Sequence, residues 1–192
     1  GSIYIAGAGV QWLRDKLNII KKASNSEHVA KSLKNNEGIY LVPAFTGLGA
    51  PYWDANARGI LSGITRNTGY KQIVRATLES CAYQSYDLIY AMKKDGIKPN
   101  IIRVDGGMSK NNWLVQFLSD IINLKIDTSK IEETTALGAA YMAGLKKGIY
   151  KSLNDISKNW KAKKRFNPRI KNSIRQKLLL EWSKAIKKAL LH

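Results

Sequence analysis

The chain has 192 residues, 44% of them hydrophobic and 24% charged, which is typical of a globular domain and not of a disordered segment. No apolar run approaches the ~20 residues that a membrane-spanning helix needs. With one cysteine, Cys81, and two histidines, the sequence predicts no disulfide, no zinc site and no histidine-dependent hydrolase triad. This composition favours a cytoplasmic setting.

The net charge of +18 is unevenly distributed along the chain. Residues 158–188 contain twelve Lys or Arg and a single acid, Glu181. Such a tail can hold nucleic acid or an anionic membrane, or it can be the solvated face of a helix. Its aromatic residues, Trp160, Phe166 and Trp182, are spaced as packing anchors and not as a row for stacking bases. We therefore favour the solvated face and expect neither a membrane nor a nucleic-acid partner.

The first half of the chain shows short apolar runs separated by small-residue turns. Residues 3–5 end in a turn at 6–9, and the helical pattern that follows has Val10, Leu13, Leu17 and Ile20 on one face. Ser24 and Glu27 have the spacing of a capping box and predict the start of a short helix. Strands are predicted at 39–42 and 59–64, with a long Gly-, Pro- and aromatic-rich loop between them.

The second half alternates helices and strands. We expect a long helix over 70–92 with Cys81 on its buried face, a strand over 101–104, a helix from Ser109, and a strand over 124–128. A helix over 134–145 is crowded with small residues, which would let it approach a sheet closely. A short helix capped at Ser152 and a last helix over 169–190 complete the chain.

This alternation predicts an α/β fold in which helices flank a sheet, and such sheets bind ligands at the carboxyl ends of their strands. The turns at 6–9 and at Gly106-Gly107 both fall at such ends. Glycine brings bare backbone close to a ligand, and the helix start beyond it offers unpaired N–H groups that suit phosphate. The two turns therefore predict a nucleotide site, although a strand–Gly–Gly–helix turn can also serve tight packing alone.

Several longer motifs resemble one family. They are the aromatic loop from Val42 to Asp54 followed by Ala57-Arg58-Gly59, the segment Gly59–Ile64 with Gln72–Glu79, Ala6-Gly7-Ala8 with Gln11–Asp15, the Gly-Gly turn, and Thr135–Ala140. Together they resemble the C-terminal half of the glycerol kinases, which belong to the FGGY carbohydrate kinases. The resemblance covers nearly the whole chain and fades after about Phe166.

The resemblance implies the second domain of an actin/hexokinase/Hsp70-like (ribonuclease H-like) fold, truncated at its N-terminus, with a nucleotide-binding domain over 1–165 and a basic C-terminal helix over 166–192. It implies transfer of a phosphoryl group from magnesium-bound ATP to glycerol, giving glycerol 3-phosphate. Carried over by position, Gly7 and Gln11 would contact the nucleotide, and Gly107 and Asn111 would hold its adenine and ribose. Gly106 and Asp105 would shape the turn.

In that family the general-base aspartate and nearly all glycerol contacts belong to the N-terminal half. We therefore expect no catalytic residue and no protein metal ligand in this chain, and little or no kinase activity from it alone. Contacts between subunits at the aromatic loop would make a homo-oligomer. Two alternatives stay open: a non-catalytic actin-fold module whose basic tail binds nucleic acid or a protein partner, and another sugar kinase of the same family.

Overall fold

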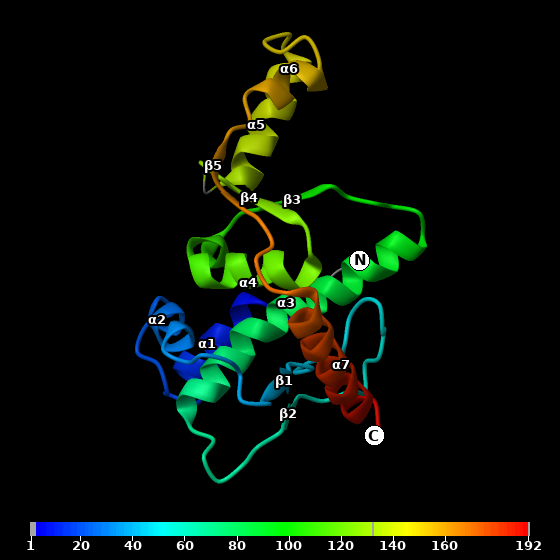
Figure 1. Cartoon of the computed structure of the whole chain (residues 1–192). Helices are drawn as coiled ribbons and strands as arrows, with labels where there is room; N and C mark the ends of the chain where they lie inside the picture. The colour runs from blue at the N-terminus through cyan, green and yellow to red at the C-terminus, as the bar shows by residue number, and fades with distance from the viewer. Residues whose placement is uncertain (1–2, 132, 192) are drawn as a thin grey trace.

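The computed structural model describes residues 3–131 and 133–191 (Figure 1). The elements in the first half of the chain are α1 (Gly7–Asp15), α2 (Asn25–Lys31), β1 (Tyr40–Val42), β2 (Ile60–Ser62) and α3 (Tyr70–Lys94). Those in the second half are β3 (Ile101–Val104), the 3₁₀ helix η1 (Gly107–Lys110), α4 (Asn112–Ile122), β4 (Lys125–Ser129), α5 (Thr134–Lys146), α6 (Leu153–Lys158), β5 (Ala162–Phe166) and α7 (Asn172–Ala189).

A mixed sheet of order β3-β4-β5 lies across the middle of the molecule. β3 and β4 are parallel, with Val104 opposite Thr128, and β5 runs antiparallel to β4, with Arg165 opposite Asp127. Helix α4 packs on one face of this sheet through Val115. A separate antiparallel pair, β1-β2, lies on the other side of α3 from this sheet. The predicted α/β architecture, a mixed sheet flanked by helices, is confirmed.

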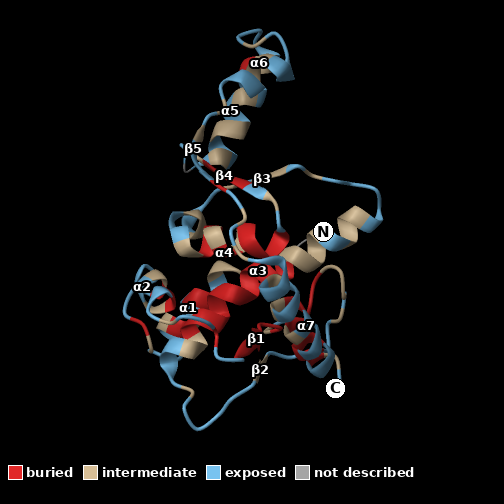
Figure 2. Cartoon of the chain, in the orientation of Figure 1, coloured by how far each residue is buried: buried red, intermediate tan, exposed pale blue. Residues whose placement is uncertain are grey.

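Helix α3 is the centre of the core, and its residues 74–84 are buried along the whole segment (Figure 2). On one side, Tyr83 stacks on Trp182 of α7 with ring centroids 5.1 Å apart. On the other side α1 packs closely, because a Cβ on Gly9 would lie 3.0 Å from Thr77 Cγ2. Cys81 is buried at this second interface, as predicted, and burial raises the pKa of its thiol to about 12.

Three local expectations for the first half of the chain were wrong. Residues 3–5 form no strand, because the Ile5 carbonyl accepts a hydrogen bond from the Gln84 side chain of α3 instead of from a neighbouring strand. Helix α1 ends at Asp15, which leaves Leu17 39% exposed. Helix α2 forms where expected, but Ser24 has helical backbone angles and its side chain makes no cap.

In the second half, the α-helix expected from Ser109 begins at Asn112 instead, after the turn of 3₁₀ helix. Strand β5 was not predicted, because its exposed basic residues give no apolar alternation of the kind that indicates a strand. It is held by a bidentate ion pair in which the Arg165 guanidinium donates to both oxygens of Asp127, each at 2.7 Å. The predicted Ser152 cap is confirmed, since its hydroxyl accepts from the Asp155 amide.

The small residues of α5 do not bring it against the sheet, as the sequence suggested. Gly144 is the one buried residue in this helix, and a Cβ there would lie 2.9 Å from the Tyr150 ring. The other small residues are exposed or half-buried, and α5 and α6 extend away from the rest of the molecule (Figures 1 and 2). A cavity remains between α5 and the sheet.

The basic tail packs through its apolar stripe. Phe166 and Trp182 are buried, as their spacing predicted, while the lysines of β5 and α7 face solvent. Ile174, expected on the same stripe as Trp182, is 51% exposed. No helix in the described part of the chain combines the length and apolar character needed to span a membrane.

Candidate functional site

The four residues singled out in the sequence lie together. Gly7 and Gln11 of α1 and Gly107 and Asn111 of the second glycine turn line one open cavity of about 460 Å³. The two turns are direct neighbours, because a Cβ on Gly7 would lie 3.8 Å from Met108 Cγ. A volume of this size is within the range of about 300–1,000 Å³ usual for small-molecule sites.

Three elements form the walls of the cavity. Helix α1 buries Val10 and Leu13 against α3 and turns Gln11 and Arg14 toward the opening. Helix α2 supplies Ser26 and Glu27, Ser24 precedes it, and η1 supplies Gly107, Met108 and Lys110. The sequence could have indicated Arg14, since Gly7, Gln11 and Arg14 share one face at helical spacing. The α2 wall depends on tertiary packing and has no such signal.

Helix α2 is held in place by a buried charge network. Arg75 of α3 donates from Nη1 to the carbonyls of Leu33 and Ala30 and from Nε to Glu79 Oε1 at 2.7 Å. Its guanidinium also lies 5.1 Å from the centre of the Trp113 ring. Burial raises the pKa of Glu79, and the adjacent Arg75 opposes that rise. The wall of the cavity therefore depends on a side chain that does not line it.

The glycine turn after β3 has a backbone conformation that requires a glycine at its first position. Gly106 has a φ of +77°, a conformation that favours glycine. The side chain that stabilises the turn is that of Ser109 and not that of Asp105. The Ser109 hydroxyl donates to the Gly106 carbonyl at 2.7 Å. Gly107 has no strain, and a Cβ built on it meets nothing within 4 Å, so its bare backbone leaves open space in the cavity.

The two helix starts at the cavity differ in what they can offer an anion. Asn111 already caps α4, because its Oδ1 accepts from the Leu114 amide at 2.9 Å. One of the N–H groups at the start of α4 is therefore already paired within the chain. Helix α1 begins at Gly7 after Ala6, with no side-chain cap. The first N–H groups of α1 can therefore face a phosphate.

The charge of the cavity wall is positive overall. Arg14 and Lys110 are its basic residues and Glu27 is its acidic one. Arg14 is paired with Asp15, whose pKa it lowers, and Glu27 with Lys31 at 2.6 Å. Among the described residues no three His, Cys, Asp or Glu side chains gather as a metal site. The cavity therefore suits an anionic ligand, and its residues do not fit a magnesium ion held by the protein.

A glycine-walled cavity beside an uncapped helix start, on an α/β scaffold, is an arrangement found in nucleotide-binding folds. The sequence profile of the FGGY family of carbohydrate kinases, C-terminal domain, matches residues 1–146. The chain belongs to this family.

The chain is similar to curated glycerol kinases. It is 53% identical over 190 residues to one from Coxiella burnetii (strain RSA 493 / Nine Mile phase I) and 50% identical over 188 residues to glycerol kinase 1 of Pseudomonas aeruginosa. These alignments cover 99% and 98% of the chain but 38% of each relative. The chain thus spans well under half the length of the curated relatives it matches.

Solved structures agree with this assignment. A glycerol kinase from Plasmodium falciparum with ADP superposes with a TM-score of 0.90 at 40% identity, covering 100% of this chain and 38% of that one. A xylulose kinase from Lactobacillus acidophilus superposes with a TM-score of 0.86 at 27% identity, covering 97% of this chain and 38% of that one. The fold is therefore that of the FGGY sugar kinases, which are actin/hexokinase-like.

Proposed function

We propose that the chain is the ATP- and ADP-binding C-terminal part of a glycerol kinase, which transfers the γ-phosphoryl group of ATP to glycerol to give glycerol 3-phosphate. The observation that carries the proposal is the meeting of Gly7, Gln11, Gly107 and Asn111 in one cavity. The high identity to glycerol kinases along nearly the whole chain supports glycerol, and not a sugar, as the phosphoryl acceptor. In this proposal residues 1–165 form the nucleotide-binding domain and 166–192 its basic C-terminal helix.

The walls suggest how the nucleotide lies. Its adenine and ribose would rest on the bare backbone of Gly107 and beside Asn111. Its phosphates would point toward the uncapped start of α1 at Gly7, where Gln11 can donate from its amide. Magnesium would arrive with the nucleotide phosphates, because the cavity has no carboxylate cluster among its described residues.

Phosphoryl transfer requires both substrates to be positioned and a residue to orient the attacking hydroxyl. Glu27 is the acid that borders the cavity, and it is paired with Lys31. The chain alone should therefore bind nucleotide yet show little or no glycerol-dependent conversion of ATP. A coupled assay for ADP measures this, and turnover at the rate of a complete glycerol kinase would contradict it.

Calorimetric titration with ADP tests the cavity itself. A Gly107→Val variant should lose ADP binding, because the valine side chain would occupy the open space beside the turn while meeting no atom within 4 Å of its Cβ. Gly138→Val, at an equally open glycine outside this cavity, is the matched control and should bind ADP normally. Equal ADP affinity in the two variants would place the nucleotide elsewhere.

The same titrations distinguish the alternative of a non-catalytic module. Tight binding of single-stranded or duplex nucleic acid with a steep salt dependence, together with no binding of ADP, would favour a role for the basic tail. The packing of that tail against the core through Trp182, with its lysines solvated, does not favour this outcome.

A further inference from the structure

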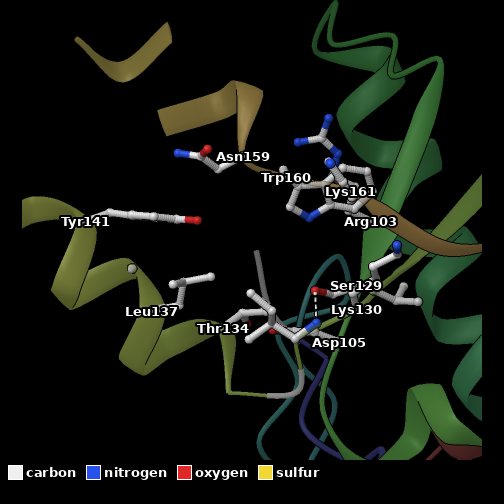
Figure 3. A pocket seen from close by; sticks show the side chains of 13 residues that line it. Arg103, Asp105, Ser129, Lys130, Thr134, Leu137, Tyr141, Asn159, Trp160 and Lys161 are labelled. Carbon is white, nitrogen blue, oxygen red and sulfur yellow. Dashed lines mark hydrogen bonds between the residues drawn. The ribbon is translucent and has the colours of Figure 1, made fainter. Parts of the chain in front are cut away.

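A second cavity, of about 450 Å³, lies at the carboxyl ends of β3 and β4 (Figure 3). It is enclosed by α5, by the carboxyl ends of β3 and β4, and by residues 159–161, which lead into β5. It shares no lining residue with the nucleotide cavity. The function proposed above makes no use of it.

Two aromatic side chains form opposite walls of this second cavity. Tyr141 projects from α5 with its hydroxyl toward the centre, and its ring is held edge-on by Tyr150 at a centroid distance of 5.5 Å (Figure 3). Trp160 is half-buried on the opposite side, where the guanidinium of Arg103 lies 3.9 Å from the centre of its ring. Both rings are therefore fixed by neighbours before any ligand enters.

The remaining wall is apolar below and positively charged at the rim. Leu137 of α5 is half-buried at the cavity floor, beside the bare backbone of Gly138. The rim bears three cations, Arg103, Lys130 and Lys161, and one acid, Asp105. Aromatic and aliphatic surfaces suit a flat apolar body, and the excess of cations suits a negative group attached to it.

We propose that this cavity binds a small planar organic anion, whose ring lies between Tyr141 and Trp160 and whose carboxylate or phosphate faces the cations. Arg103 has two roles in this arrangement. It stacks on Trp160, and its guanidinium, oriented by that contact, can pair with a carboxylate or phosphate. This site shares no lining residue with the nucleotide cavity, so the planar anion and the nucleotide would not compete for the same space.

The experiment titrates the chain with 1-naphthyl phosphate and with 2-naphthoate, following the indole N–H signal of Trp160 by NMR. Both anions should bind and shift that signal, and neutral 1-naphthol should bind several-fold more weakly; their relative affinities show whether phosphate or carboxylate is preferred. ADP at a concentration that saturates the nucleotide cavity should not displace them.

Two variants locate the binding. Gly138→Val should weaken binding of the naphthyl anions by about tenfold or more, because its side chain would project into the cavity from a position where a Cβ meets nothing within 4 Å. Arg103→Gln should weaken binding of the anions much more than binding of 1-naphthol, because it removes the cation while also loosening the contact that fixes Trp160. Gly107→Val is the reciprocal control: it should lose ADP and retain the naphthyl anions.

Any of several results would overturn the proposal. They are the absence of naphthyl-anion binding at millimolar concentration, equal affinity for 1-naphthol, unchanged affinity in both Gly138→Val and Arg103→Gln, and displacement by ADP. Circular dichroism of each variant shows whether α5 is intact, and Arg103→Gln keeps the test decisive if Gly138→Val does not fold.

Discussion

Asp87 lies where α3, α7 and the aromatic loop meet, and one of its carboxylate oxygens accepts two hydrogen bonds. Tyr52 donates its hydroxyl at 2.9 Å and Trp182 its indole N–H at 2.7 Å. Burial raises the pKa of Asp87 to about 6, and the two hydrogen bonds only partly oppose it. The folded chain therefore binds this proton more tightly than the unfolded chain does.

The sign of the pH effect follows from that difference. Protonation of Asp87 stabilises the fold fully below the unfolded pKa of about 4, and this contribution is lost as the pH rises through about 6. Asp87→Asn keeps an acceptor for both donors without the charge. Its stability relative to the natural chain should fall by on the order of 2 kcal/mol between pH 7 and pH 4. Urea unfolding across this range measures the difference, and a flat difference would contradict the assignment.

Arg75 and Glu79 give a second prediction for single residues. Arg75→Met leaves a buried carboxylate without its cation and frees the carbonyls that hold α2, so stability should fall by about 3–5 kcal/mol. Adding Glu79→Gln removes the uncompensated charge and keeps an acceptor for the Tyr83 hydroxyl. Denaturant unfolding should show that the double variant recovers part of the stability lost in Arg75→Met. No recovery would mean that lost packing, and not the unpaired charge, causes most of the destabilisation.

At the scale of elements, Asn111 joins a structural role to a proposed ligand role. It caps α4 through the Leu114 amide and also lines the nucleotide cavity. Asn111→Ala should cost about 1 kcal/mol of stability and weaken ADP binding. Asn111→Asp keeps the capping oxygen and should retain stability, yet still weaken ADP, because a carboxylate cannot donate as the amide does. Unfolding and calorimetry of the pair separate the two roles.

The sequence located most elements because their patterns are local. Apolar spacing placed α3 and β3, and the small residues Gly7 and Gly107 marked both turns that border the cavity. What it could not locate depends on partners distant in the chain. Strand β5 is held by the pairing of Arg165 with Asp127, and the α2 wall by Arg75. Residues 3–5 have strand-like composition, but the Gln84 side chain replaces a neighbouring strand.

On the scale of the whole molecule, stability should be unevenly distributed. Residues 74–84 of α3 are buried from every side, whereas Gly144 is the one buried residue of α5, and the described residues of α6 include none (Figure 2). Amides of α5 and α6 should therefore exchange with solvent about two orders of magnitude faster than those of α3, because opening them exposes little apolar surface. Hydrogen-exchange mass spectrometry tests this, with the buried face of α7 as a protected reference.

The turn after β3 has one cavity on each side: Asp105 borders the cavity under α5, and Gly107, two residues later, borders the one beside α1. A single residue, Gly106, separates these two walls along the chain, and its positive φ is a conformation that favours glycine. If a ligand in one cavity changes the affinity of the other cavity for its ligand, thermodynamic linkage requires the second ligand to change the affinity for the first by the same factor. An ADP titration repeated at saturating 1-naphthyl phosphate would measure that factor directly.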